Sequence, residues 1–240
     1  TTHPEFLRAV IKVLKNNNNK VVVGDSPSVL DFEKVVKETQ VLKICEEENV
    51  ECLNLSTYKT CEINYGRFGI DKLVVSKIIF EVDYIINLPK LKTHSLTVFT
   101  CAVKNMFGIV PGMTKSLYHR YVPHPRKFVE LLYDIYSIRK PDLTIVDGIV
   151  GMDGDGPANG EPRKFNLIIT GTSGDAVDWF VAKKVLKVKN NYPYEKKYFS
   201  LPDKVEYVNF DNFEQQKVYL PKTVSLFPWL PSIVLDILKH

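Results

Sequence analysis

Lysine and histidine side chains gather in one stretch of this 240-residue chain that contains no carboxylate. No aspartate or glutamate occurs between Asp83 and Glu130, although the chain has 28 acidic residues in all. The cations and histidines of that stretch are Lys90, Lys92, Lys104, Lys115, Arg120, Arg126 and Lys127, with His94, His119 and His124. Ammonium groups bind phosphate and carboxylate, and a histidine beside them has a lowered pKa and can act as a general base or metal ligand. The stretch therefore predicts a site for an anionic ligand; a solvated surface that binds nothing is the alternative.

The spacing of the first two lysines predicts that they act together. Lys90 and Lys92 follow the apolar run 84–88, and alternation places both on one side while the chain stays extended. Thr93 is expected to cap a helix predicted at 95–107, whose first amides would favour an anion. We predict Lys90 and Lys92 as ligand-binding residues; a charged loop that merely leads into a helix is the alternative.

The next lysines lie farther along the chain. Lys104 and Asn105 stand at the end of the predicted helix, where a lysine also suits the helix dipole without any ligand. Lys115 and His119 are four residues apart, so on a helix they share one face. We predict Lys104, Asn105 and Lys115 as ligand-binding residues. His94 and His119 are predicted to transfer protons, against the alternative that they are structural.

Carboxylates and glycines gather in a second region, at 147–178. Its acidic residues are Asp147, Asp153, Asp155, Glu161, Asp175 and Asp178. Glycine permits close approach of a ligand to the backbone, so Gly154 and Gly156 are predicted to bind the ligand; a long surface hairpin is the alternative. The twelfth position counted from Asp153 is Lys164 rather than glutamate, which excludes an EF-hand.

Two of the aspartates stand where predicted strands end. Asp25 and Asp147 could each bind a divalent metal, which prefers oxygen ligands, or orient a lysine. A simple turn is the alternative for Asp25. A lysine- and histidine-rich face opposite carboxylates would suit a phosphorylated or carboxylated ligand, with a divalent metal as the candidate cofactor.

Several function classes are excluded or disfavoured by composition. The four cysteines form no Cys-x-x-Cys pair, so no zinc site or iron–sulfur cluster is read from this chain. No Gly-x-Ser-x-Gly sequence occurs, which argues against a serine hydrolase. A net charge of +4 is too weak to predict nucleic-acid binding. No apolar run is long enough to span a membrane and no secretory signal is seen, so we predict a cytoplasmic protein.

Buried β runs alternate with amphipathic helices, which predicts an α/β fold: a mainly parallel sheet with flanking helices. Strands are predicted at 21–23, 50–55, 72–76, 84–88, 143–146, 165–170, 205–210 and 216–220, and helices at 31–48, 95–107, 125–139 and 175–188. In such sheets ligands bind at the carboxyl ends of strands, where the loops 24–27, 89–94 and 147–160 are expected. The chain opens directly on a helix, which suggests that the fold lacks an N-terminal strand.

A change of composition near residue 190 divides the chain. Residues 1–190 are predicted to form the α/β domain. Residues 191–240, rich in tyrosine, proline and lysine, are predicted to be an extension that packs on the same domain. An apolar segment at 226–239 would suit that docking.

These motifs together resemble an uncharacterised family, domain of unknown function 362. The matching pieces are Thr2-His3-Pro4, Gly24-Asp25-Ser26-Pro27, Asn87 to His94, Lys104 to Gly108, Lys115 with His119, Val146-Asp147-Gly148, and Gly154 to Pro157 with Gly160. The resemblance spans about residues 2–188 and implies a prokaryotic, cytoplasmic protein. Family members often carry a ferredoxin-like iron–sulfur module, whose cysteine run is absent from this chain.

Two functions follow from the residues and the resemblance. The first is an enzyme that binds a small anion through the lysines and histidines. The alternative is a redox accessory protein that works with an iron–sulfur module or partner protein. The sequence leaves open whether the chain is an enzyme.

Overall fold

The computed structural model describes residues 1–157, 159–188, 193–194 and 218–221. It is a mixed α/β structure in which parallel strands are flanked by helices, and this confirms the predicted fold class. The predicted strand at 205–210 and the segment 226–239 lie outside the described residues, as does most of the predicted extension.

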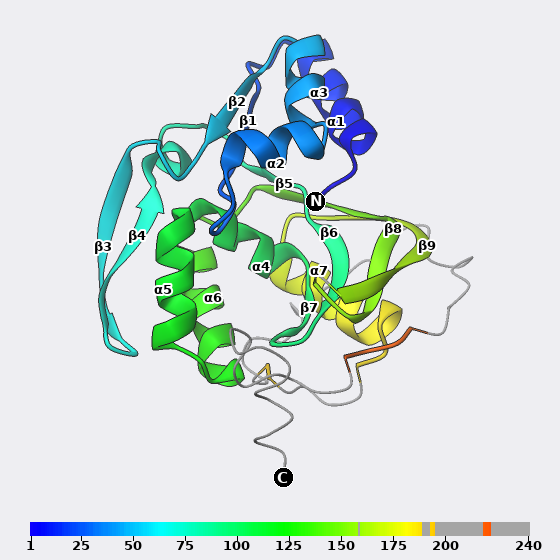
Figure 1. Ribbon diagram of the computed structural model, residues 1–240. Helices are drawn as coiled ribbons and strands as arrows, with labels where there is room; N and C mark the ends of the chain where they lie inside the picture. Colours follow the sequence, from blue (N-terminus) through cyan, green and yellow to red (C-terminus); the bar gives the residue numbers. More distant parts are fainter. Residues whose placement is uncertain (158, 189–192, 195–217, 222–240) are drawn as a thin grey trace.

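A small layer at the N-terminal end packs three helices around two strands (Figure 1). Its elements are α1 (Pro4–Asn16), β1 (Val22–Asp25), α2 (Phe32–Glu38), α3 (Val41–Glu47) and β2 (Glu51–Asn54). β1 and β2 pair in parallel, and Leu7, Ile11 and Ile44 form the centre of the apolar cluster beneath them. The helix predicted at 31–48 is two helices, because Gln40 adopts a left-handed conformation with φ of 61° between them.

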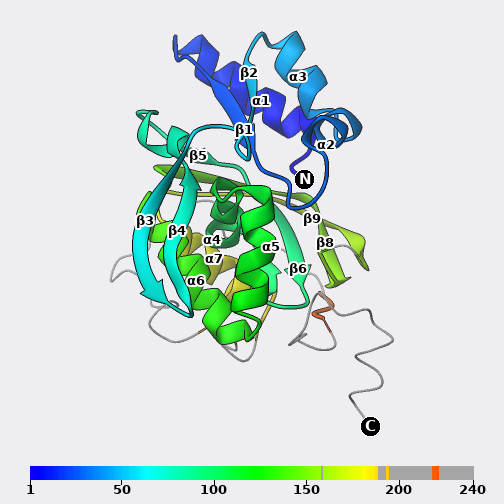
Figure 2. The ribbon, with the colours of Figure 1, turned by 60° about the vertical axis from the view of Figure 1, so that its left-hand side comes forward.

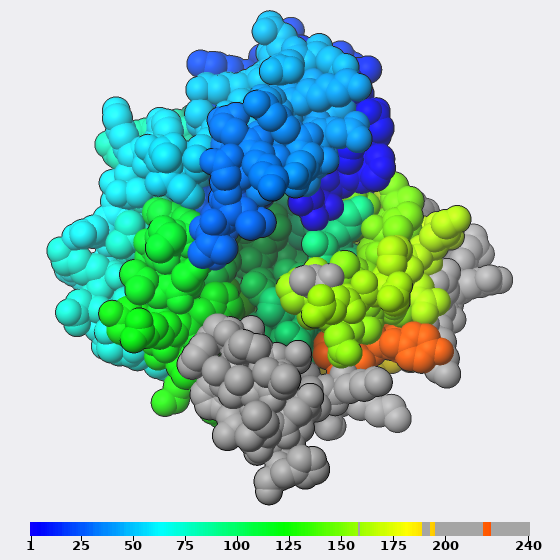
Figure 3. Space-filling model, viewed as in Figure 1, coloured from blue at the N-terminus to red at the C-terminus, as the bar shows by residue number. Residues whose placement is uncertain are grey.

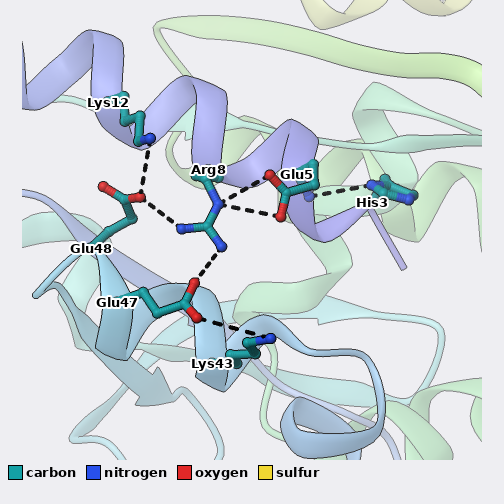
Figure 4. A network of polar contacts seen from close by, with 7 residues as sticks. All are labelled: His3, Glu5, Arg8, Lys12, Lys43, Glu47 and Glu48. Carbon is teal, nitrogen blue, oxygen red and sulfur yellow. Dashed lines mark hydrogen bonds and ion pairs between the residues drawn. The ribbon is translucent and has the colours of Figure 1, made fainter.

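An ion-pair network joins α1 to α3 (Figure 4). The Arg8 guanidinium lies 2.9 Å from the Glu48 carboxylate and 3.1 Å from that of Glu5, and it also pairs with Glu47. Arg8 is the centre of the network because its planar fork can serve several carboxylates at once. The network holds the N-terminal helix in a fixed position, and His3 at the helix start donates its backbone N–H to Asp147, 2.9 Å away.

An antiparallel hairpin forms one side of the molecule (Figure 2). It consists of β3 (Thr60–Arg67) and β4 (Ile70–Ser76), followed by a short 3₁₀ helix at Lys77–Phe80. β4 was predicted near 72–76. β3 was not predicted, because its side chains alternate between exposed and half-buried positions and include few large apolar residues. Arg67 fastens the hairpin to the neighbouring helix by pairing with Glu130 at 2.6 Å.

The central sheet has the order β5-β8-β6-β7, and β9 pairs with β8. Its strands are β5 (Ile86–Asn87), β6 (Lys90–His94), β7 (Val98–Thr100), β8 (Leu143–Asp155) and β9 (Asn159–Gly171). β8 pairs in parallel with β5 and β6, whereas β6–β7 and β8–β9 are antiparallel. The predicted loop at 147–160 is therefore the end of a long hairpin, the alternative named for it, because residues 147–155 continue β8 and residues 159–160 begin β9.

The helices that follow β7 cover the sheet. They are α4 (Ala102–Asn105), a 3₁₀ helix at Met106–Ile109, α5 (Gly112–Tyr121), α6 (Pro125–Ile138) and α7 (Gly174–Phe180), which continues as a π-helical turn at Val181–Val185. The helices predicted at 125–139 and 175–188 are confirmed. Phe99, Leu131 and Val146 lie fully buried between these helices and the sheet. No helix of the described residues is both long and apolar enough to cross a membrane.

Two local predictions were wrong. The segment 95–107 is helical only in its last part, where α4 and the start of the 3₁₀ helix lie; β7 precedes them, because side chains such as Phe99 and Thr100 favour extended backbone. The segment from Lys90 to His94 is strand β6 rather than a loop. Thr93 therefore caps no helix, and its hydroxyl donates to the Gly154 carbonyl at 2.8 Å.

Candidate functional site

Two lysine ammonium groups lie beside one aromatic ring at the centre of the cationic stretch. Lys104 Nζ is 5.6 Å from the centroid of the Phe107 ring, and Lys115 Nζ is 6.0 Å from the same centroid. Lys104 comes from α4, Phe107 from the 3₁₀ helix that follows, and Lys115 from α5. This tight succession of three short helical elements brings the two cations together around Phe107.

Lys115 is buried and is held by the loop that follows β1. Its ammonium donates a hydrogen bond to the Ser26 carbonyl oxygen. The Ser26 hydroxyl donates to the Val110 carbonyl at 2.8 Å, so the loop is fixed against the start of α5. Burial lowers the pKa of Lys115 to about 8, and the charge of Asp25 opposes that shift. This is an effect of charge alone, and the predicted role of Asp25 in orienting a lysine stays a prediction.

Lys104 has no such partner. Among the described residues it makes neither a hydrogen bond nor an ion pair, and its ammonium faces the rings of Phe107 and Phe128, the latter 5.9 Å away. Burial lowers the pKa of Lys104 to about 8, and the charges of Lys115 and Lys92 lower it further in the same direction. An ammonium that is partly kept from water without a counter-charge is costly.

His119 lies beside Lys104 and is neutral at physiological pH. Its ring stacks on Phe128 with centroids 4.2 Å apart, and it meets the edge of Phe107 at 5.8 Å. Burial, with a smaller contribution from the Lys104 charge, lowers its pKa to about 3. Its Nδ1 atom is buried and has no hydrogen-bond partner among the described residues. The predicted sharing of one helix face by Lys115 and His119 is confirmed, because both lie on α5.

His94 is buried at the end of β6 in a defined tautomer. Its Nδ1 accepts hydrogen bonds from the backbone N–H groups of Leu96, at 3.1 Å, and Thr97, at 3.4 Å. An Nδ1 that accepts must be unprotonated, so Nε2 carries the proton of the neutral ring. Burial lowers the pKa of His94 well below its ordinary value, with further lowering by nearby positive charge, first that of Lys104. His94 therefore offers an N–H donor and no charge.

Lys92 completes the cluster. It lies on β6, half-buried, two residues before His94, and its charge lowers the pKa of both His94 and Lys104. The structure thus brings together five of the residues predicted from the sequence, which we call the cationic cluster: Lys92, His94, Lys104, Lys115 and His119. They come from one strand and two helices at the same side of the sheet.

Lys90 does not belong to this cluster, although it alternates with Lys92 along β6. Its ammonium pairs with the buried Asp147 carboxylate and also donates to the Val150 carbonyl at 3.0 Å. Asp147 further accepts the His3 N–H at 2.9 Å and the Ile149 N–H at 3.3 Å. Lys90 and Asp147 are bonded to each other and to backbone groups. These contacts account for both charged side chains without a ligand.

The metal prediction for Asp25 and Asp147 gains no support from the geometry. Within the described residues no group of three or more histidine, cysteine, aspartate or glutamate side chains is arranged to hold a metal ion. Asp25 accepts the Ser26 N–H at 2.7 Å, and Asp147 is paired with Lys90. Asp147 neutralises Lys90, and the metal-binding role stays a prediction for both aspartates.

The remaining predicted ligand-binding residues hold the backbone in place. Asn105 is exposed, and its amide donates to the Asn87 side-chain oxygen at 2.7 Å, which joins α4 to β5. Gly154 donates its N–H to the Tyr219 carbonyl at 2.6 Å. A Cβ at Gly156 would lie 2.2 Å from the Thr93 carbonyl oxygen, so this glycine permits the hairpin to pack against β6. None of these contacts requires a ligand.

One important residue was missed. Asp178 on α7 is fully buried and accepts the N–H groups of Ala102, at 2.7 Å, and Val103, at 3.1 Å, at the start of α4. Burial raises its pKa to about 7. It fixes the short helix that presents Lys104. Its sequence spacing gives no sign of this, since 76 residues separate it from Ala102.

One face of the molecule is hollowed. Figure 3 shows a hollow between the blue segment around α2, the green helix α5 and the yellow-green tip of the β8–β9 hairpin, with the darker green of the α4 region at its floor. The fold and the cluster together define an α/β protein with a group of lysines and histidines at the side of its central sheet.

Comparison with known proteins shows which family this is. The chain belongs to the family described as domain of unknown function, DUF362, whose model matches residues 1–183. It is 32% identical over 193 residues to a thylakoid-associated protein from Synechocystis sp., and the match covers 78% of this chain. The chain spans 57% of the length of that relative. No solved structure matches significantly.

Proposed function

We propose that this chain binds a small phosphorylated or carboxylated molecule at the cationic cluster. The observation that carries the proposal is the pair of half-buried and buried lysines around Phe107. Neither Lys104 nor Lys115 has a carboxylate within ion-pairing distance among the described residues, although Lys115 is buried and Lys104 is half-buried. An anion between them would supply the missing counter-charge and form charge-assisted hydrogen bonds.

We further propose that the bound molecule undergoes a proton-transfer reaction. His119 presents an unpartnered, buried Nδ1, and His94 presents an Nε2–H donor. Both rings are neutral near pH 7, so one can accept a proton while the other donates a hydrogen bond to developing negative charge. Lys92, Lys104 and Lys115 would hold the anion in reach of the two rings.

Anion binding is tested by calorimetry with inorganic phosphate and with oxalate as probes. Lys104→Met and Lys115→Met each remove one ammonium but keep most of the apolar stem. Because a charge-assisted hydrogen bond contributes about 1.5–3 kcal/mol, each variant should bind at least about 10-fold more weakly. Lys72→Met is the matched control, since Lys72 is an exposed lysine that pairs with Glu62 on the β3–β4 hairpin.

The control should retain wild-type affinity. Equal weakening by Lys72→Met would show that the protein attracts anions only through its overall charge, and the proposed site would then be wrong. Undiminished binding by both cluster variants would also refute it.

Neither the iron–sulfur partnership nor the cytoplasmic location gains a supporting observation from the described residues, and both stay predictions. The Synechocystis relative is named for its association with thylakoids. A location at a membrane surface is therefore the alternative that fractionation of cells producing this chain should test.

A further inference from the structure

We propose that Lys104 is a covalent nucleophile, which forms an imine with the carbonyl group of a small oxo acid held in the cationic cluster. This inference rests on the proposed function, because it takes the anion of that site to be the carboxylate of the oxo acid. It adds the substrate class and the reacting atom, Lys104 Nζ.

The first argument is the contrast among the lysines of the site. Lys90 is paired with Asp147, and Lys115 donates to the Ser26 carbonyl. Lys104 Nζ has no hydrogen-bond or ion-pair partner among the described residues, and lies 5.6 and 5.9 Å from the centroids of two phenyl rings. An amine that serves only to hold structure would be expected to have a partner. Within the part of the chain that the structure describes, the Lys104 ammonium is thus free to react.

The second argument is how the protein holds this lysine. Lys104 lies on a single turn of helix, and that turn is held at three points by side chains from elsewhere. Asp178 accepts the N–H groups of Ala102 and Val103, and Asn87 donates to the Ala102 carbonyl at 2.9 Å. A buried carboxylate and a buried amide thus orient one short helix. Burying these two polar side chains costs free energy, and such a cost is expected where the position of a reacting atom matters.

The third argument is the electrostatic setting. Apolar surroundings and neighbouring cations favour the neutral amine, and only the neutral amine attacks a carbonyl. Two phenyl rings supply the apolar wall, and Lys92 and Lys115 supply the neighbouring charge. The lowered pKa of Lys104, about 8, agrees with this setting.

The reaction balances without any further reagent. The Lys104 amine attacks the carbonyl carbon of the oxo acid, a C–N bond forms, and a proton moves from nitrogen to the former carbonyl oxygen to give a carbinolamine. Protonation of that hydroxyl breaks the C–O bond, and the oxygen leaves as water. The nitrogen retains one proton, so the product is a protonated imine. Lys92 and Lys115 would bind the carboxylate, and the His119 Nδ1 would accept and return protons.

The test traps the imine by reduction. The full-length protein is incubated with pyruvate or glyoxylate and sodium cyanoborohydride, and the labelled lysine is located by peptide mass spectrometry. We expect one adduct per chain, at Lys104, and competition by oxalate. Lys104→Arg keeps a positive charge but cannot form the imine, so it should lose the adduct. Lys72→Met should keep it.

The outcomes separate this inference from the proposed function. Oxalate binding measured by calorimetry, together with no adduct at Lys104 in the wild-type protein, would overturn the imine and leave the anion site standing. Absence of both oxalate binding and adduct would overturn both. Labelling spread over exposed lysines, or unchanged labelling of the Lys104→Arg variant, would likewise show that Lys104 is not the nucleophile.

Discussion

Lys104 and Lys115 place their ammonium groups within 6.0 Å of the same ring centroid, that of Phe107. Each cation interacts favourably with the ring, yet the two positive charges repel each other. Among the described residues, Lys115 has compensation nearby, from the Ser26 carbonyl and the charge of Asp25, whereas Lys104 has no hydrogen-bond or ion-pair partner. In the absence of a ligand this arrangement lowers the stability of the fold, and an anion between the two lysines would restore it.

The first prediction concerns the pH dependence that follows from these lysines. The pKa of Lys104 falls from its ordinary value of 10.5 to about 8 in the folded protein. Between pH 8 and 10.5 the unfolded chain therefore holds more protons, and the free energy of unfolding rises with pH over that window. Lys104→Met removes the charged group, so at pH 7 it should raise the free energy of unfolding by about 1–3 kcal/mol.

Urea unfolding followed at pH 7, 8, 9 and 10 checks this. The difference between wild type and Lys104→Met should shrink as pH rises, because the wild-type lysine loses its proton in the fold. A constant difference across the range, or a less stable variant at pH 7, would contradict the lowered pKa.

The second prediction concerns acid. Burial lowers the pKa of His119 from 6.5 to about 3, so below pH 6.5 the unfolded chain binds a proton that the folded chain does not. The stability contributed by the neutral ring is complete above pH 6.5 and is lost as pH falls toward 3, at up to about 1.4 kcal/mol per pH unit. His119→Gln removes this titration. Asp178, whose pKa is raised to about 7, acts in the opposite sense but equally in both proteins.

Thermal unfolding of wild type and His119→Gln between pH 6.5 and 4 measures the difference directly. We expect the wild type to lose stability faster on acidification. Parallel curves would mean that His119 titrates normally in the fold.

The third prediction concerns Lys90 and Asp147. Lys90→Met leaves the fully buried Asp147 carboxylate without its cation, which should lower the free energy of unfolding by about 3–5 kcal/mol. The double variant Lys90→Met with Asp147→Asn removes both charges and should be more stable than Lys90→Met alone. Denaturant titrations of the wild type, both single variants and the double variant complete the cycle. Additive effects would show that the two groups do not interact.

Much of this arrangement could be predicted from the sequence, and the residues show why. Lys115 and His119 share a face of α5 because helical spacing alone decides it. Lys104 lies near them because the intervening segment is short. The α/β class follows from apolar runs, such as Leu143–Val146, that alternate with amphipathic helices such as α6.

What could not be predicted depends on contacts between distant parts of the chain. Lys90 and Lys92 are both lysines and lie two positions apart on one strand, yet among the described residues only Lys90 contacts a carboxylate, which lies 57 residues away in sequence. The register between β6 and β8 decides that, and a bulge shifts it between the two lysines. In the sequence, the β8–β9 hairpin resembles a ligand-binding loop, because both kinds of segment are rich in glycine and aspartate. Only the pairing of β8 with β9 shows that the segment is a hairpin.

The last prediction concerns the glycines of that hairpin. A Cβ at Gly156 would lie 2.2 Å from the Thr93 carbonyl oxygen, which is backbone and cannot turn aside. Gly156→Ala should therefore move the hairpin tip away from β6, break the hydrogen bond from the Ser95 N–H to the Gly156 carbonyl, and cost about 2–4 kcal/mol. Gly154→Ala is the matched comparison: its Cβ would have only Gly160 nearby, at 3.9 Å, but Gly154 has φ of +76°, which disfavours alanine by about 1 kcal/mol. Urea unfolding gives the two costs, and hydrogen exchange at Ser95 reports the separation of the strands. A larger cost for Gly154→Ala than for Gly156→Ala would show that backbone conformation, rather than the close approach to Thr93, makes glycine necessary at the tip.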